Sequence, residues 1–198
     1  DNDGLLDGEE ISIYLTDPTS NDTDGDGMPD GWEVKYGLDP LDSIDAMLDT
    51  DNDSFDFDWN GNITSSELYS NLYEYWNGTN PINGDTDNDG MPDGWEVSWN
   101  LQPLNSSDAY DDSDNDTLIN LYEYDNSRVD GYDDNVVSPD NITGSNPLLK
   151  DTDRDLIWDG EECVFGEDGY VTDPSNPDSD DDGMPDGWEM MYDLDPFD

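Results

Sequence analysis

The sequence contains no histidine and only four basic residues against 55 acidic ones, which gives a formal net charge of -51. The basic residues are Lys35, Arg128, Lys150 and Arg154. Because so few cations cannot form a patch that neutralises phosphates, we expect no nucleic acid or anionic lipid surface as a partner. No apolar run approaches the roughly 18 residues of a membrane-spanning helix, so we also expect no membrane insertion.

Apolar aliphatic residues and cysteine are scarce as well. Leu, Ile, Val and Phe make up about 18% of the 198 residues. With this charge, such a fraction is typical of disordered chains and excludes a conventional hydrophobic core. Cys163 is the only cysteine, so it is either a small, partly buried thiol or the partner of a cysteine outside this sequence. The 7 Trp and 11 Tyr argue against plain disorder, and we therefore expect bound cations to order the chain.

A repeated acidic segment dominates the sequence. The string Asp-Gly-Met-Pro-Asp-Gly-Trp-Glu begins at Asp26, Asp89 and Asp182, and each copy ends a twelve-residue loop. The loop has oxygen-bearing side chains at positions 1, 3, 5, 9 and 12, and the strongest copies have glycine at position 6. Seven loops follow this pattern. We name each loop after its first residue, and the first loop begins at position 3.

The predicted ligands of the Asp1, Asp22 and Asp56 loops are Asp1, Asp3, Asp7 and Glu10; Asp22, Asp24, Asp26, Met28, Asp30 and Glu33; and Asp56, Asp58, Asn60, Asn62, Thr64 and Glu67. Those of the Asp85 and Asp112 loops are Asp85, Asp87, Asp89, Met91, Asp93 and Glu96; and Asp112, Asp114, Asp116, Leu118, Asn120 and Glu123. Those of the Asp151 and Asp178 loops are Asp151, Asp153, Asp155, Ile157, Asp159 and Glu162; and Asp178, Asp180, Asp182, Met184, Asp186 and Glu189. At position 7 the expected ligand is the backbone carbonyl.

The chemistry of this spacing favours calcium. Ca2+ takes about 6 to 8 oxygen ligands at about 2.3 to 2.6 Å. Short Asp side chains at alternate positions of a curled loop converge on one point, Gly at position 6 permits the turn, and Glu at position 12 binds with both oxygens. Mg2+ demands stricter octahedral geometry, and Zn2+ would lack its usual His and Cys ligands. We therefore expect about seven or more calcium ions.

The charge excess indicates that further ions bind. The ligand positions of the seven loops hold 31 of the 55 carboxylates, and seven ions would still leave a net charge of -37. Asp49, Asp51 and Asp53 are the expected additional ligands, together with Asp45 and its counterpart Asp108. In this register Glu74 lies outside every loop.

The Asp-x-Asp-x-Asp-Gly-x-x-Asp runs resemble thrombospondin type 3 repeats, and the Asp-Gly-x-x-Asp-Gly-Trp-Glu version resembles the Asp-rich repeats of secreted bacterial and archaeal proteins. The resemblance covers nearly the whole chain. It implies a chain that winds around a line of calcium ions with little regular secondary structure. Two features depart from the family: its paired cysteines are absent, which makes calcium the principal staple, and segment 125–150 is longer than its counterparts.

The expected fold is mostly irregular. It consists of calcium-stapled tandem repeats of EF-hand-like loops with short helices and small strands, elongated and without a conventional hydrophobic core. We divide it into units 1–48, 49–111 and 112–198, as a window of a longer chain. Helices of about two turns should follow the strong loops, with their Trp, Tyr and Leu residues covering the loop beneath. Residue patterns also predict a longer helix over Ser65–Trp76, a strand over Ile11–Leu15 and a hairpin over Val164–Val171.

Sequons of the form Asn-x-Ser/Thr occur seven times and predict glycosylation of an extracellular chain. Asn77, Asn105 and Asn141 lie in polar linkers and are the better candidates. The other sequons are at Asn21, Asn52, Asn62 and Asn115, and the last three lie inside or beside calcium loops, where Ser and Thr also suit the loop itself.

No enzyme is expected, because histidine is absent and the carboxylates are committed to ion loops. One alternative is a dockerin-like binding module, although dockerins are short duplicated units. Another is a calcium-dependent spacer or stalk that presents an adhesin or an enzyme. The long, divergent array favours an extracellular structural protein: a calcium-stabilised rod or filament subunit of a cell surface or matrix. Its expected partners are itself in head-to-tail assembly, or neighbouring repeats, and glycans.

Overall fold

The structure is a computed structural model that describes residues 1–55, 68–124, 144–163 and 169–198. The chain forms two compact units. Unit 1 comprises Asp1–Asn88, Pro92–Ser98 and Gln102–Leu104, and unit 2 comprises Asp89–Met91, Trp99–Leu101 and Asn105–Asp198. The division into 1–48, 49–111 and 112–198 stays a prediction.

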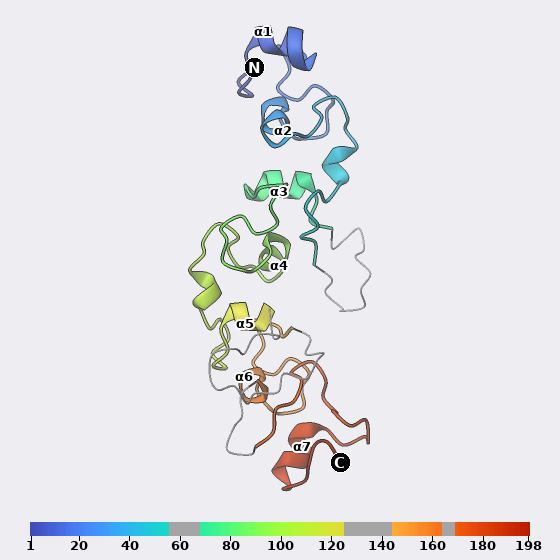
Figure 1. Ribbon diagram of the computed structural model, residues 1–198, viewed down its shortest axis with the longest axis vertical. Coiled ribbons are helices and arrows are strands. Elements are labelled where there is room, and N and C mark those ends of the chain that lie inside the picture. The colour runs from blue at the N-terminus through green and yellow to red at the C-terminus, as the bar shows by residue number, and fades with distance from the viewer. Residues whose placement is uncertain (56–67, 125–143, 164–168) are drawn as a thin grey trace. The chain divides into compact units, whose positions relative to one another are not determined.

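Short helices joined by loops make up both units (Figure 1). Unit 1 contains α1 (Asp7–Glu9), the π-helix η1 (Glu10–Tyr14), α2 (Asp30–Tyr36), the 3-10 helix η2 (Asp45–Met47), α3 (Asn71–Asn77) and α4 (Asp93–Ser98). Unit 2 contains the 3-10 helix η3 (Asp108–Tyr110), α5 (Asn120–Tyr124), α6 (Asp159–Glu162) and α7 (Asp186–Met191). The architecture is helix-poor and irregular, as predicted. Among these helices, none is long and apolar enough to cross a membrane.

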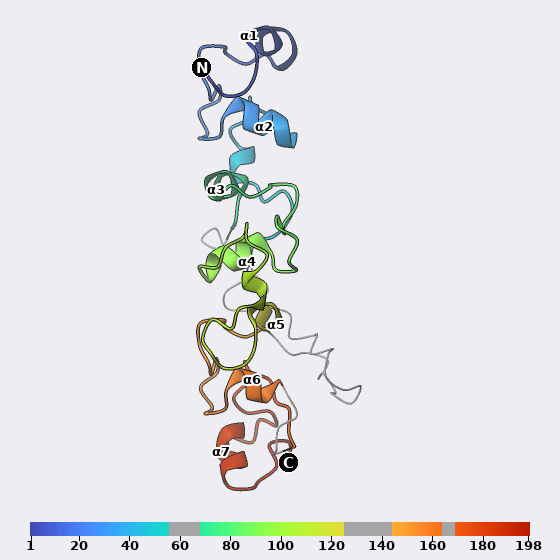
Figure 2. The same ribbon diagram turned by 90° about the vertical axis from the view of Figure 1, so that its left-hand side faces the viewer.

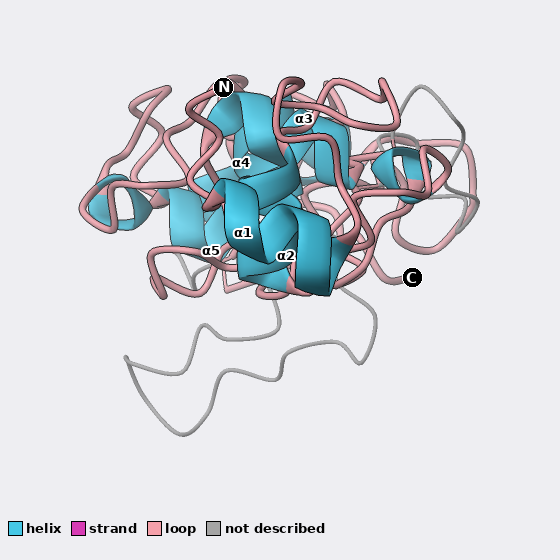
Figure 3. Cartoon of the chain, turned by 90° about the horizontal axis from the view of Figure 1, so that it is seen from above, coloured by secondary structure: helices cyan, strands magenta, loops and turns pink. Residues whose placement is uncertain are grey.

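No strand occurs in the described parts of the chain (Figure 3). The strand predicted over Ile11–Leu15 is wrong, because the backbone N–H groups of Glu9 and Glu10 donate to the Leu6 carbonyl and start a helical segment instead. The alternating residues Ile11 and Ile13 are each 63% exposed, so no partner strand buries them. Of the predicted hairpin, residues 164–168 lie outside the described residues, and residues 169–171 form no strand.

The two-turn helices after the loops are confirmed. In α2, the extended Pro29 precedes the first turn, and its carbonyl accepts hydrogen bonds from Trp32 and Glu33 at 2.8 and 3.1 Å. Gly37, with φ 80°, ends the helix in the left-handed conformation that glycine adopts easily. Of the helix predicted over Ser65–Trp76, residues 65–67 lie outside the described residues and residues 68–70 are not helical, so the short helix α3 begins only at Asn71 (Figure 2).

Acidic groups rather than aliphatic side chains occupy much of the interior. Among the described residues, buried polar side chains outnumber buried apolar ones, as expected for a chain without a conventional core. The apolar ones include the position 7 side chains Met28, Met91, Leu118 and Ile157. In these four loops the side chain at position 7 therefore anchors the loop in the interior. Trp95 is also fully buried, as predicted for the covering aromatic residues, whereas the equivalent Trp188 is 40% exposed, so the predicted covering role does not hold for every loop.

Candidate metal centres

The acidic side chains of each loop hold its backbone in a curl. In the Asp22 loop, the N–H groups of Gly25 and Gly27 donate to the two carboxylate oxygens of Asp22 at 2.7 and 3.1 Å. The Met28 N–H donates to Asp26 Oδ1 at 2.8 Å. Gly27 has φ 104°, which explains the glycine at position 6. Within the described residues, the second oxygens of Asp24 and Asp26 are buried without a hydrogen-bond donor, so they remain available to a cation.

Asp26 belongs to two groups of carboxylates whose oxygens are close enough together to bind one metal ion. Oxygens of Asp22, Asp24 and Asp26 lie within 4.8 Å of one another, and so do oxygens of Asp26, Glu33 and Asp45. Asp45 belongs to η2 and not to the loop, so the linker after the loop supplies a carboxylate to it. The sequence analysis expected Asp45 as a ligand without saying which loop it joins. The structure assigns it to the Asp22 loop.

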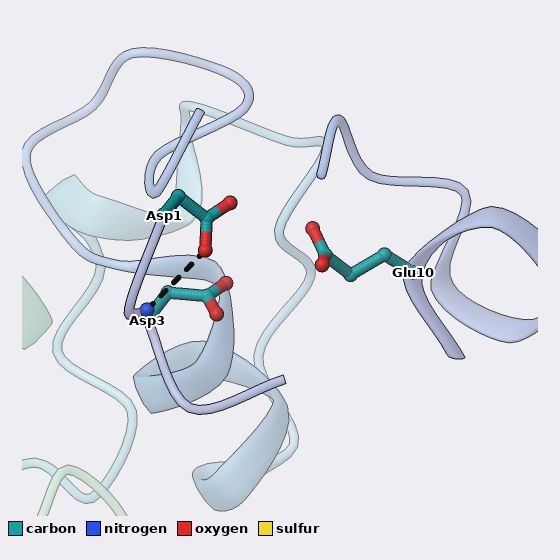
Figure 4. Close-up of side chains that lie close together, drawn as sticks. All are labelled: Asp1, Asp3 and Glu10. Atoms are coloured by element: carbon teal, nitrogen blue, oxygen red, sulfur yellow. Dashed lines mark hydrogen bonds between the residues drawn. The ribbon is translucent and has the colours of Figure 1, made fainter. Parts of the chain in front are cut away.

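The Asp1 loop gathers its carboxylates in the same way. Oxygens of Asp1, Asp3 and Glu10 lie within 4.8 Å of one another. Figure 4 shows the carboxyl group of Glu10 extended toward the two Asp side chains, with the Asp3 N–H donating to Asp1 Oδ1 at 3.4 Å. Glu10 is 1% exposed, whereas Asp7 at position 9 is exposed.

Burial of the position 12 glutamates is the most consistent feature of the loops. Their side chains are 1% exposed or less at Glu10, Glu33, Glu96, Glu123, Glu162 and Glu189. Burial, followed by the nearby Asp26 and Asp24 carboxylates, raises the pKa of Glu33 to about 9. The same causes, with other neighbours, raise the pKa of Glu123 to about 9 and that of Glu162 to about 10. Such carboxylates need either a proton or a cation, and an all-oxygen ligand set suits Ca2+.

Position 9 has a structural role that the spacing did not predict. In the Asp22 loop, Thr23 donates its backbone N–H and its hydroxyl to the two oxygens of Asp30 at 2.7 and 2.6 Å. We call this arrangement the 2–9 clasp. It recurs between Thr86 and Asp93, Thr152 and Asp159, and Ser179 and Asp186. Thr or Ser at position 2 was the sequence signal for the clasp, and ligation of an ion by position 9 stays a prediction.

A second missed position is the glycine at position 10. The N–H groups of Gly94, Gly160 and Gly187 donate to carboxylate oxygens of Asp53, Asp116 and Asp155 at 3.1, 2.9 and 2.8 Å. Each of these Asp residues belongs to the acidic segment that precedes the glycine's own loop. A Cβ atom on Gly160 would lie 2.6 Å from the Asp116 carbonyl oxygen, so only glycine permits this approach. The loops therefore contact one another in series through backbone atoms.

The remaining predicted sites have mixed outcomes. The Asp56 loop and Asn141 lie outside the described residues. Asn77 is exposed, and Asn105 is partly exposed, with its Oδ1 accepting a hydrogen bond from Ser107 at 2.7 Å. Glycosylation of these residues stays a prediction.

Cys163 is buried, and burial raises the pKa of its thiol, which fits the buried-thiol alternative.

Comparison with known proteins identifies part of the chain. The model of the bacterial TSP3 repeat matches residues 1–21, 22–43 and 85–98, so these segments are similar to bacterial TSP3 repeats. This confirms the resemblance to thrombospondin type 3 repeats over these segments, and its extension to nearly the whole chain stays a prediction. Such repeats bind calcium and occur in extracellular proteins. No curated protein and no solved structure gives a significant match.

Proposed function

We propose that this chain is an extracellular structural protein, a rod or filament subunit of a cell surface or matrix whose fold calcium holds together. The observation that carries the proposal is the burial of the position 12 glutamates in the described loops, where Glu10, Glu33, Glu123, Glu162 and Glu189 lie near Asp carboxylates instead of in an apolar core. Several carboxylates cannot share a dry interior unless protons or cations neutralise them. About seven or more Ca2+ ions would supply that charge.

A structural role for the ions is favoured over a catalytic one. The chain has no histidine, and in the Asp22 loop the carboxylates of Asp22, Asp26 and Asp30 already accept hydrogen bonds from the loop's own backbone. A Ca2+ ion held by such a set leaves little room for a substrate, so we propose that the chain is not an enzyme. Site affinities suited to roughly 0.1 to 1 mM calcium would match the extracellular environment.

Filament formation is favoured because the loops contact their neighbours in series. A module that cannot bury a core alone is stabilised by its neighbours, and head-to-tail contacts that do not close produce fibres. A spacer that presents an adhesin or an enzyme uses the same loops, and it is the second candidate. Glycans on Asn77, Asn105 or Asn141 would protect an exposed polymer, and an intact mass above that of the polypeptide would reveal them.

Calcium chelation tests the proposal. Small-angle scattering and circular dichroism should show an ordered chain in 1 mM Ca2+ and an expanded chain after chelation, because the negative charges then repel. Magnesium at equal ionic strength serves as the control, and it should restore much less order than calcium. A chelated chain that keeps its dimensions would contradict calcium stapling. Electron microscopy in millimolar calcium should show fibres, whereas isolated monomers with and without calcium would favour the spacer.

A further inference from the structure

Three acidic residues of unit 1 have the spacing of a calcium loop, but the residues that follow them directly in the sequence do not complete one. Asp49, Asp51 and Asp53 alternate as positions 1, 3 and 5 do, and their oxygens lie within 4.8 Å of one another. Counting on without a gap places position 12 at Asn60, which is not a glutamate. The register must therefore resume elsewhere for a calcium loop to form here.

The structure brings Glu74 to this group. Oxygens of Asp53, Glu74 and Asp93 lie within 4.8 Å of one another, and all three residues are buried. Glu74 is 0% exposed, and within the described residues no donor reaches either of its carboxylate oxygens. The same holds for Asn71 Oδ1 and Asp53 Oδ1 in this part of the structure. Unpartnered oxygens that are this deeply buried and that face one another indicate a bound cation.

Hydrogen bonds show that Asn71 occupies position 9. Its N–H donates to the carbonyl of Leu48, which directly precedes Asp49, at 2.8 Å. In the uninterrupted Asp112 loop, the N–H of Asn120 at position 9 donates to the carbonyl of Asp111, which directly precedes Asp112, at 2.9 Å. The side-chain amides of the two asparagines make equivalent hydrogen bonds as well. Asn71 Nδ2 donates to the Asp45 carbonyl at 2.8 Å, and Asn120 Nδ2 donates to the Asp108 carbonyl at 2.8 Å.

The helices that follow repeat the same sequence. Asn-Leu-Tyr-Glu-Tyr occurs at residues 71–75 in α3 and at residues 120–124 in α5. If Asn71 is at position 9, Glu74 is at position 12, where Glu123 lies in the Asp112 loop. Both glutamates are fully buried.

Tyr69 occupies position 7. A Cβ atom on Gly94 would lie 3.1 Å from Tyr69 Cβ, and a Cβ atom on Gly187 would lie 3.0 Å from a side-chain carbon of Ile157, which is at position 7 of its loop. The Tyr69 N–H donates to Ser54 Oγ at 2.7 Å, so the segment that ends at Ser54 and the segment that begins at Tyr69 lie next to each other. Positions 1 to 6 are therefore residues 49–54, and positions 7 to 12 are residues 69–74. The fourteen residues 55–68 are inserted between them.

We propose that Asp49, Asp51, Asp53, Asn71 and Glu74 form a split calcium loop that is interrupted after position 6 by an insertion containing the Asp56 loop. This inference rests on the proposed calcium stapling and adds a site to it. The donor set consists entirely of oxygens, as in the other loops, and the expected position 7 ligand is the Tyr69 carbonyl.

Calcium counting on the full chain tests the split loop. Native mass spectrometry in calcium should show that Glu74→Gln binds at least one ion fewer than the wild type. Glu33→Gln, in the uninterrupted Asp22 loop, should lose an ion equally. Glu161→Gln is the matched control, because Glu161 is exposed and lies at no ligand position, and its ion count should equal that of the wild type. If Glu33→Gln loses an ion and Glu74→Gln does not, the split loop is overturned and calcium stapling stands. If the wild type binds no calcium, both fail.

A deletion variant keeps the test decisive if Glu74→Gln does not fold. Deletion of residues 55–68 joins Ser54 directly to Tyr69 and produces an uninterrupted twelve-residue loop. The shortened chain should lose only the ions of the Asp56 loop, and its order should still depend on calcium. In this shortened chain, Glu74→Gln should again remove at least one ion. Disruption of unit 1 by the deletion alone, or an unchanged ion count after Glu74→Gln in the shortened chain, would overturn the assignment.

Discussion

Substitution of Gly31 by alanine should weaken the contact between the Asp1 and Asp22 loops. A Cβ atom on Gly31 would lie 2.9 Å from the Asp3 carbonyl carbon and closer still to its oxygen. Both are backbone atoms and cannot rotate away. Overpacking of this kind costs about 1–3 kcal/mol, and alanine in a helix gains back only about 0.5–1 kcal/mol over glycine. The free energy of unfolding of unit 1 should therefore fall, by up to about 2.5 kcal/mol.

Gly8→Ala is the matched control for this prediction. Gly8 lies in α1 of the same unit, and an added Cβ would have nothing within 4 Å. Alanine there should leave the stability unchanged or raise it by up to about 1 kcal/mol, because it stiffens the unfolded chain. Urea unfolding at a fixed millimolar calcium concentration would measure both variants. Equal stability of Gly31→Ala and Gly8→Ala would refute the backbone contact between the loops.

Two other features lead to measurable effects. The hydroxyl of Thr152 accepts a hydrogen bond from the Asn146 N–H at 2.9 Å and donates one to Asp159 at 2.7 Å, so Thr152→Val should lower stability by about 2–3 kcal/mol. The exposed Thr50, at position 2 of a loop with Asn71 at position 9, is the control, and an equal loss in Thr50→Val would argue against the clasp. In the calcium-free chain, the pKa of Glu33 and Glu123, about 9, lies above the ordinary 4.5, so the folded state binds more protons than the unfolded state between these values. Their contribution to stability is therefore full below about pH 4.5 and is lost as the pH rises toward 9, so the chelated chain should be more compact at pH 4 than at pH 9. Small-angle scattering of the chelated chain at both pH values would measure this, and equal dimensions would speak against protonated glutamates.

The ligand positions could be predicted from sequence wherever the loop is continuous. Asp22, Asp24, Asp26 and Glu33 were recognisable because calcium chemistry fixes their spacing within one stretch of chain. Glu74 was placed outside every loop because counting along the sequence assumes that no insertion intervenes. The repeated Asn-Leu-Tyr-Glu-Tyr at residues 71–75 and 120–124 was the available signal.

Other features depend on contacts that spacing does not encode. The alternation of Ile11 and Ile13 suggested a strand, but a strand needs a neighbour, and the turn that follows position 9 makes this segment helical. The glycine at position 10 offers no ligand and led to no prediction, whereas in the structure it admits the backbone of another loop. The 2–9 clasp was missed because an Asp at position 9 resembles a ligand when only the sequence is read.

The position 10 glycines also determine how order spreads along the chain. In unit 2, Asp116 accepts the Gly160 N–H, and Asp155 in the loop of Gly160 accepts the Gly187 N–H. In unit 2 these bonds thus couple each loop only to the loops directly before and after it, as in a one-dimensional Ising chain in which every link has its own stability plus a nearest-neighbour coupling. Such a chain does not melt all at once. As calcium becomes scarce, a boundary between ordered and disordered loops should travel along it link by link, so that the calcium concentration determines the length of the ordered part.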